Sequence, residues 1–287
     1  MGVRSSVVAG QFYESSPDRL RKQINSCFLS KFGPGSLPYA KKSKKIFGCI
    51  VPHAGYQFSG PAAAFAYKAI AESRKPKNFI ILGPNHSGMG AEVSTSLLDW
   101  ETPLGVVKVD ADFVSKLVKK CDFIEVDDSA HLYEHSIEVQ LPFLQFVLKD
   151  KFKFVPICLA SHDFKILKRL GECIALIGRD SCVVASSDMT HYGYGYGYLP
   201  FSQNKKENMY KLDKRAIDAI TSLDVSAFVS HIERSHATIC GYAPIITAVF
   251  AVKKLGCKKA RLLKYYTSGD VLNDYSSSVG YASIVFE

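Results

Sequence analysis

Three apolar runs of the sequence end in side chains that could bind a metal ion or move protons. The runs cover residues 45–51, 78–82 and 181–185. His53 follows the first run, His86 follows the second, and Asp188 and His191 follow the third. Short β-branched runs are typical of buried strands, and ligands of open α/β sheets lie beyond the carboxyl ends of the strands. We therefore predict one site, with His53 and His86 as metal ligands and Asp188 and His191 as catalytic groups.

A further metal ligand could come from Cys240, which directly precedes a predicted helix over residues 241–255. The dipole and free N–H groups of a helix N-terminus lower the pKa of a thiol and favour thiolate. Imidazole and thiolate together suit iron or copper, with zinc as another candidate. The alternative is a cysteine beside a helix cap without any partner.

A second metal motif is His131-Leu132-Tyr133-Glu134-His135, which fits the H-x-x-E-H signature of one class of zinc peptidases. On a helix the two histidines, four residues apart, would face the same way. The competing interpretation makes Glu134, His135 and Glu138 the polar start of a helix over residues 134–149. There they would border the pocket or orient a metal ligand through hydrogen bonds.

Tyrosine and glycine alternate from Tyr192 to Tyr198. The segment lacks the Lys and Ser/Thr of a phosphate-binding loop. It is either an aromatic flap beside the site or an ordinary surface loop. As a flap, it would suit a second function, in which the protein binds a peptide or partner at the pocket without turnover.

Strands and helices alternate along the chain, which favours an α/β fold: a central mixed or parallel sheet sandwiched by helices. We expect further strands at residues 105–109, 152–159, 261–267 and 279–286, and further helices at residues 17–31, 61–73, 110–120, 164–178, 206–221 and 225–233. Pro61 is expected as the first residue of its helix. No break in composition divides the chain, so we interpret residues 1–287 as one domain.

Composition is that of a globular protein, with 47% hydrophobic and 22% charged residues. No apolar stretch approaches the length of a membrane span and no signal peptide is recognisable, so we expect a cytoplasmic protein without membrane contact. The eight cysteines include no C-x-x-C pair, which favours buried thiols over disulfides.

The formal net charge is +9, but the basic residues are dispersed. Their densest cluster, residues 41–45, is interpreted as a solvated loop, because no recognisable nucleic-acid module surrounds it. We therefore expect no sequence-specific nucleic acid as a partner.

Several of these segments together resemble the Memo family, whose archaeal and bacterial members are also called AmmeMemoRadiSam system protein B. The resemblance rests on residues 8–13, 52–56, 59–60, 82–86, 134–138, 186–188, 191, 240–241, 267–270 and 279–281. It implies the fold of class III (LigB-like) extradiol dioxygenases, in which two His and one Glu hold iron and another His acts as acid and base.

Carried over to this chain, the resemblance implies that His53 and His86 are metal ligands, that Cys240 stands where the dioxygenases have Glu, and that His191 is the acid/base group. It implies iron or copper as cofactor and a redox role with a small molecule or a peptide as ligand. The substrate is not implied, and a homo-oligomer is compatible with the family.

Overall fold

The computed structural model describes residues 2–39, 44–149 and 151–287, so positions 41–43 of the lysine cluster lie outside it. Its mixed sheet has the strand order β1-β5-β6-β8-β3-β9-β2-β12-β10, with β4, β7 and β11 paired beside this path. The strands are β1 (Val3–Arg4), β2 (Gly48–Val51), β3 (Phe79–Pro84), β4 (Val93–Thr95), β5 (Asp99–Thr102), β6 (Gly105–Val109), β7 (Glu125–Val126), β8 (Lys153–Leu159), β9 (Cys182–Ser186), β10 (His191–Tyr192), β11 (Ala260–Thr267) and β12 (Ser278–Phe286). The α/β architecture predicted from the sequence is thereby confirmed.

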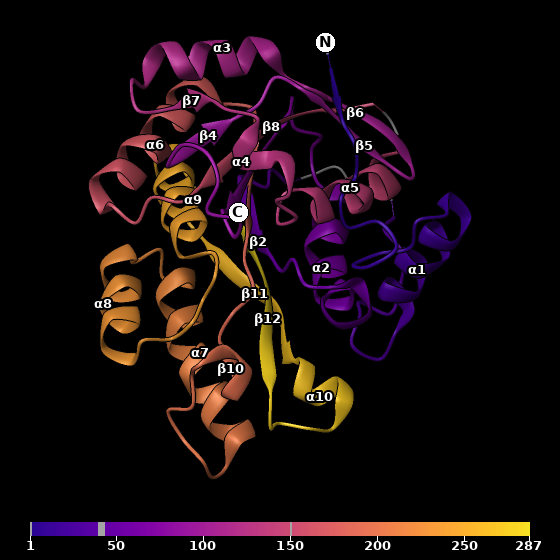
Figure 1. Cartoon of the computed structure of the whole chain (residues 1–287), viewed down its shortest axis with the longest axis vertical. Coiled ribbons are helices and arrows are strands. Elements are labelled where there is room, and N and C mark those ends of the chain that lie inside the picture. Colours follow the sequence, from indigo (N-terminus) through magenta and orange to yellow (C-terminus); the bar gives the residue numbers. More distant parts are fainter. Residues whose placement is uncertain (1, 40–43, 150) are drawn as a thin grey trace.

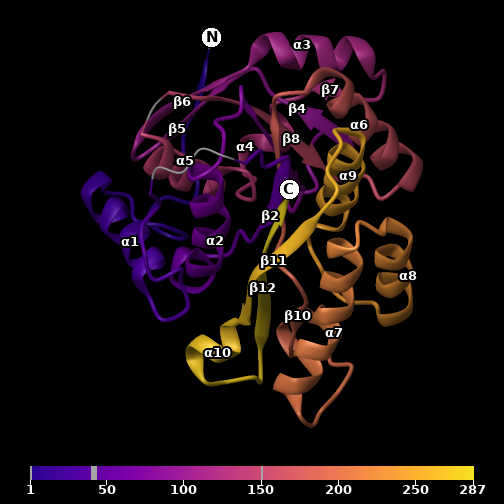
Figure 2. The same cartoon turned by 180° about the vertical axis from the view of Figure 1, so that it is seen from behind.

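Helices cover both faces of this sheet (Figures 1 and 2). Helices α1, α2 and α5 pack together on one side, and α3, α6 and α9 pack together on the other. The helices are α1 (Pro17–Leu29), α2 (Tyr56–Ala71), α3 (Ala111–Lys120), α4 (Ser129–Leu132), α5 (Leu141–Leu148), α6 (Phe164–Ile177), α7 (Lys205–Thr221), α8 (Val225–Ser235), α9 (Tyr242–Lys254) and α10 (Ser268–Leu272), with 3-10 turns η1 (Glu138–Gln140) and η2 (Tyr194–Tyr196). One hydrophobic core joins residues from Val8 to Phe286, which supports the interpretation of a single domain.

The centre of the sheet is parallel, and its register brings three strand ends to one edge. β9 lies between β2 and β3, and both pairs are parallel. Val51 is opposite Ser186, while Leu82 is opposite Ala185. The chain therefore leaves all three strands at the same level, and the residues that follow them enter the same region, as the sequence pattern predicted.

β12 continues the sheet beyond this edge and anchors the loop after β9. It is antiparallel to β2 through residues 284–286 and to β10 through residues 278–279, with His191 opposite Val279. Figure 1 shows β11 and β12 descending between α7 and α10. The short β10 strand thus fixes the backbone of His191 against the far end of β12.

Two predicted helix boundaries are wrong. α2 starts at Tyr56, with Pro61 inside the helix rather than at its first residue. Contacts outside the helix stabilise this early start, since the backbone N–H of Tyr56 donates to Phe12 O and its hydroxyl donates to Val139 O. The helix predicted over residues 134–149 is restricted to η1 and α5, and Pro142 occupies the first turn of α5, where its missing N–H costs little.

The prediction of buried free thiols holds for most of the cysteines but fails for one pair. Cys121, at the end of α3, forms a disulfide with Cys173 of α6. Sequence spacing could not reveal it, because the two residues are 52 positions apart and meet only through the packing of α3 on α6. Among the described residues, no helix combines the length and apolarity needed to cross a membrane.

Candidate metal centre

His53 follows β2 and is held rigidly in the core. Its backbone N–H donates to Asp188 Oδ1 (2.9 Å), and its Nδ1 lies 2.9 Å from Ser186 Oγ. The Ser186 hydroxyl donates its only proton to Ser136 O (2.6 Å), so it accepts from the imidazole, which carries its proton on Nδ1. The lone pair of Nε2 therefore points into the site.

Glu134 orients His86 from behind. Its carboxylate accepts the backbone N–H of His86 (2.6 Å) and lies 3.0 Å from His86 Nδ1. Burial opposes ionisation of Glu134, but the hydrogen bond from His86 and the nearby imidazoles outweigh it and lower the pKa to about 2. An ionised carboxylate only accepts, so Nδ1 of His86 donates and its Nε2 is free to bind a metal ion.

His135 lies beside this pair, with its Nδ1 3.5 Å from Glu134 Oε1. Burial lowers the pKa of His135 to about 4, and burial together with the neighbouring imidazoles lowers that of His53 well below its usual value. Both rings are therefore neutral at pH 7, the state in which imidazole binds metals.

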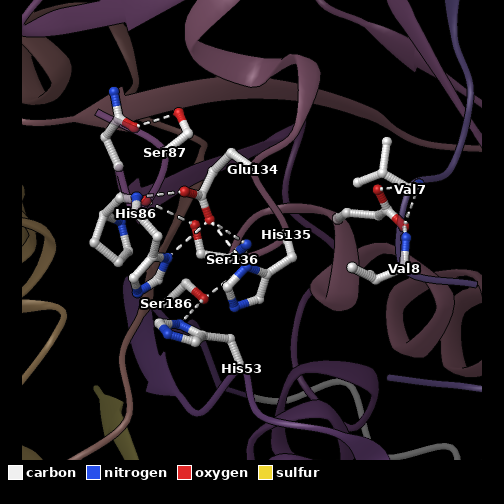
Figure 3. A network of polar contacts seen from close by, with 12 residues as sticks. Val7, Val8, His53, His86, Ser87, Glu134, His135, Ser136 and Ser186 are labelled. Carbon is white, nitrogen blue, oxygen red and sulfur yellow. Dashed lines mark hydrogen bonds and ion pairs between the residues drawn. The ribbon is translucent and has the colours of Figure 1, made fainter. Parts of the chain in front are cut away.

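Figure 3 shows the rings of His53, His86 and His135 close together near Ser186, with Glu134 on one side of the group. Ring centroids are 5.2 Å apart for His53 and His86 and 4.7 Å apart for His86 and His135. One nitrogen of each ring lies within 4.8 Å of the other two. These three imidazoles could hold a metal ion together.

Cys240 reaches the same place from the start of α9. Its Sγ lies 3.2 Å from His53 Nε2, and the backbone N–H of Asp188 donates to it (3.3 Å). His53, Asp188 and Cys240 form a second group whose ligand atoms lie within 4.8 Å of one another. His53 belongs to both groups, so the residues predicted from separate parts of the chain meet around one imidazole.

The pKa predicted for Cys240 is wrong in direction. Burial raises the pKa of this thiol well above its usual value, and the Asp188 carboxylate acts the same way. The N-terminus of α9 is too weak to reverse this. Burial also raises the pKa of Asp188, although His191 and the backbone N–H of His53 favour its ionised form. Cys240 becomes thiolate only if a nearby cation supplies positive charge.

His191 is oriented by Thr238 on the segment before Cys240. His191 Nδ1 lies 3.0 Å from Thr238 O, and the two residues exchange two further hydrogen bonds through the Thr238 hydroxyl. A carbonyl oxygen only accepts, so Nδ1 is protonated and Nε2 can accept a proton. The ring of Tyr196 packs edge-on against His191, 5.1 Å away, while Tyr194 is 89% exposed.

The structure contradicts the zinc-peptidase interpretation of the H-x-x-E-H motif. α4 ends at Leu132, so His131 and His135 do not share a helix face. His131 is buried against Trp100, with 5.8 Å between ring centroids, and Arg4 Nε donates to its backbone carbonyl. Among the described residues, the candidate ligand groups include His135 but not His131.

Glu138, expected to border or support the site, holds the N-terminal segment instead. It accepts hydrogen bonds from Arg4, Tyr13 and the backbone N–H groups of Val7 and Val8. The orienting role belongs to Glu134, while Ser186 and Thr238 were not predicted to position histidines. The sequence places Ser186 and Thr238 two residues before Asp188 and Cys240, and this proximity was the one clue to their role. No sequence spacing identifies a hydroxyl or carbonyl group that will orient a histidine.

Comparison with known proteins identifies the family of this chain. The sequence profile of the family described as "Memo-like protein" matches residues 4–285. MEMO1 family proteins of Methanopyrus kandleri and Nitrosopumilus maritimus are 46% and 42% identical to this chain, and each alignment covers at least 98% of both sequences. A MEMO1 family protein of Methanocaldococcus jannaschii is 41% identical over 99% of each sequence.

A crystal structure of an uncharacterized protein from Escherichia coli K12 has a similar fold, with a TM-score of 0.59 over 85% of this chain and 100% of that one. Its sequence identity is 12%, so this likeness concerns the fold alone. The profile match and the relatives extend over nearly the whole sequence, and this chain belongs to the Memo family.

Proposed function

We propose that the protein holds one metal ion with His53, His86 and Cys240 and carries out redox or oxygen chemistry on a small molecule. The observation that carries this proposal is that two groups of candidate ligands share His53: its ring lies with the imidazoles of His86 and His135 in one group and with Asp188 and the Cys240 thiol in the other. Family membership supports the same conclusion. The donor set suits iron or copper, and zinc is chemically acceptable.

His53 and Cys240, two of the three proposed ligands, have suitable spacing for a single ion, whereas His86 and Cys240 belong to different groups and would have to approach each other on binding. Two donors bonded to one zinc-sized ion, at about 2.3 Å for sulfur and about 2.0 Å for nitrogen, stand roughly 3.5 Å apart. Cys240 Sγ and His53 Nε2 are 3.2 Å apart, so little movement would bring both onto an ion. A bound metal would act as a Lewis acid and redox centre and would favour the Cys240 thiolate.

The protein's own residues supply proton transfer beside the metal. His191 Nε2, left free by the bond from Nδ1 to Thr238 O, would accept a proton from a hydroxyl of the small molecule and return it later. A positioned acid/base group of this kind contributes about 10²- to 10⁴-fold in rate. Asp188 holds the backbone of His53 and lies beside Cys240, where its carboxylate would hydrogen bond to a donor group of the ligand.

Metal content tests this proposal most directly. The protein is purified without a metal-affinity tag, and the His53→Ala/His86→Ala variant is compared with a His162→Phe/His236→Asn control by elemental analysis. Both control histidines are exposed, and His236 has a left-handed φ of 54° that Asn tolerates. We expect about one ion per chain in the wild type and the control, and only traces in the site variant. Equal trace metal in wild type and site variant would refute the proposal.

The third ligand needs a separate experiment, because His135 competes with Cys240 for that role. We expect Cys240→Ala to abolish the sulfur-to-metal charge-transfer absorption of the copper-loaded protein, and His135→Ala to preserve it. Absence of this absorption from the copper-loaded wild type would assign the third position to His135. Absorption that survives in Cys240→Ala would show that another thiol binds the copper, and would refute Cys240 as the ligand.

A second candidate function is recognition of a peptide or partner at the site without turnover. Tyr194 is 89% exposed, and the partly exposed Tyr196 beside it packs on His191. These exposed rings favour a role in binding. Pull-down from the native cell with Tyr194→Ala and Tyr196→Ala variants would check it, and unchanged partners would exclude the flap as the contact.

We also propose a cytoplasmic location. Six of the eight cysteines are free thiols, which suits a reducing compartment.

A further inference from the structure

The edge of the sheet opposite the metal centre carries a series of adjoining hollows with basic rims. The two largest have volumes of about 590 and 550 Å³ and share Lys108, Lys151 and Phe152. Smaller hollows continue the series through Asp180 and Arg179. We call this surface the amino-edge face, because it lies where the parallel strands begin.

The amino-edge face accounts for the net charge of the whole protein. Twelve basic residues and three acidic ones line its hollows, which gives +9. The chain has 36 basic and 27 acidic residues, so the rest of the molecule has 24 of each and is neutral in sum. The basic residues are Arg21, Lys45, Arg74, Lys75, Lys77, Lys108, Lys116, Lys149, Lys151, Lys153, Arg179 and Lys254.

Five of these cations follow the order of the strands. Lys108 of β6 lies at this edge of the sheet, and its partner in the strand register is Lys153 at the start of β8. Lys77, Arg179 and Lys45 precede β3, β9 and β2 by two or three residues. These strands are neighbours in the order β6-β8-β3-β9-β2. At about 4.8 Å between strands, the five cations form a row roughly 20 Å long.

Local acids and helix ends do not neutralise this row. Asp110 is occupied by Asn78 and by the N-terminus of α3, and Lys108 pairs with Asp99. Lys77, Lys153 and Arg179 make no ion pair with any residue that the structure describes. The carboxyl ends of α2, α6 and α9 face this side, but each supplies only about half a negative charge. Most of the positive charge is therefore available to a ligand.

We propose that the amino-edge face binds the phosphate backbone of nucleic acid without reading its sequence. A row of roughly 20 Å matches about six nucleotide steps of 3.4 Å in a duplex, and backbone binding needs only cations along that line. The concave shape, with Phe113, Phe152 and Ile177 between the charges, suits a rod-shaped polyanion better than a flat membrane surface. Sequence analysis could not find the row, because two of its members lie in strands β6 and β8 and three lie just before β3, β9 and β2, in separate parts of the chain.

The test is fluorescence anisotropy with a labelled DNA duplex two helical turns long, at several salt concentrations. With five phosphate contacts, the slope of log K against log salt should be about −4.5. The Lys77→Glu/Lys153→Glu/Arg179→Glu variant should have a slope of about −2, with at least tenfold weaker binding.

The control is Lys31→Glu/Lys211→Glu/Arg215→Glu, which changes three exposed cations outside the amino-edge face by the same charge. At 0.1 M salt, where the Debye length is about 10 Å, it should bind within about threefold of wild type. Circular dichroism and metal content confirm that each variant is folded.

Three outcomes would overturn the proposal. One is no binding of wild type up to about 10⁻⁴ M, the weak end of sequence-independent binding. Another is an equal loss of binding in the two triple variants. The third is a wild type that does not bind the duplex but binds phosphatidylserine vesicles, with vesicle binding lost in the amino-edge variant. This result would assign the face to a membrane surface.

Discussion

Replacing Glu134 with Gln should weaken metal binding without touching a ligand. Glu134 Oε2 accepts the backbone N–H of His86 (2.6 Å), while Oε1 accepts the backbone N–H of Ser136 (2.8 Å) and lies 3.0 Å from His86 Nδ1. A glutamine amide has one accepting oxygen and one donating NH₂ group. In either orientation of the glutamine amide, its NH₂ group faces an N–H donor of His86 or Ser136, and that hydrogen bond is lost.

The expected loss can be worked out from these contacts. Removing the carboxylate partner of a ligating histidine costs about 10- to 100-fold in metal affinity, which corresponds to about 1.4 to 2.7 kcal/mol. Zinc is a suitable probe ion because it has no redox chemistry. A competition titration of metal-free protein against a fluorescent zinc chelator would measure the change.

Glu138→Gln is the matched control in the same segment. Glu138 is equally buried, but its partners are Arg4, Tyr13 and the N-terminal backbone. This variant should lower the free energy of unfolding and leave zinc affinity unchanged. If Glu134→Gln binds zinc as tightly as the wild type, or if both variants lose the same affinity, Glu134 does not orient His86 for metal binding.

The same carboxylate predicts a pH effect on stability. The pKa of Glu134 is about 2 in the folded protein and ordinarily 4.5, so its ionised form stabilises the fold above pH 4.5. A shift of this size corresponds to roughly 3 kcal/mol, lost as pH falls from about 4.5 to 2. Urea unfolding of metal-free protein across this range should show the loss in the wild type and not in Glu134→Gln. Equal pH profiles would contradict the assignment.

Three further variants test the surroundings of the site. Burial lowers the pKa of His131 to about 4 from 6.5, so this residue should contribute a loss of up to roughly 3 kcal/mol as pH falls from 6.5 to 4. His131→Phe should reduce the loss measured by urea unfolding by that share, while the lowered pKa values of His53 and His135 keep the rest. The variant should keep the metal, and metal loss would count against this assignment. Cys121→Ser/Cys173→Ser opens a loop of 52 residues and should lower the free energy of unfolding by about 4 kcal/mol. A thiol titration that finds eight free thiols in the native wild type would contradict the disulfide. Tyr13→Phe removes a 2.6 Å hydrogen bond to buried Glu138 and should lower the free energy of unfolding by about 1.5 to 3 kcal/mol. Thermal unfolding measures this change, and an unchanged melting midpoint would contradict it.

Much of the fold could be predicted because its signals are local. The apolar runs before His53, His86 and Asp188 are buried strands, and their parallel pairing follows from the helices between them. Helix errors occurred where contacts distant in sequence outweighed local preference. The Tyr56 end of α2 is one example, since its partners Phe12 and Val139 are far away along the chain.

The candidate site divides in the same way. Residue type and position after a strand singled out His53, His86, Asp188 and His191 from the sequence alone, and position before a helix singled out Cys240. Only tertiary structure could decide which donors touch. His53 and Cys240 are 187 positions apart and their atoms are 3.2 Å apart.

The local spacing of His131 and His135 suggested a shared metal, but packing separates the two residues: His131 lies in the core against Trp100, and His135 lies beside His53 and His86. The chemistry of each side chain is therefore a property of the sequence. Its pKa, its hydrogen-bond partners and its neighbours depend on burial and on contacts between distant segments, which exist only in the folded chain.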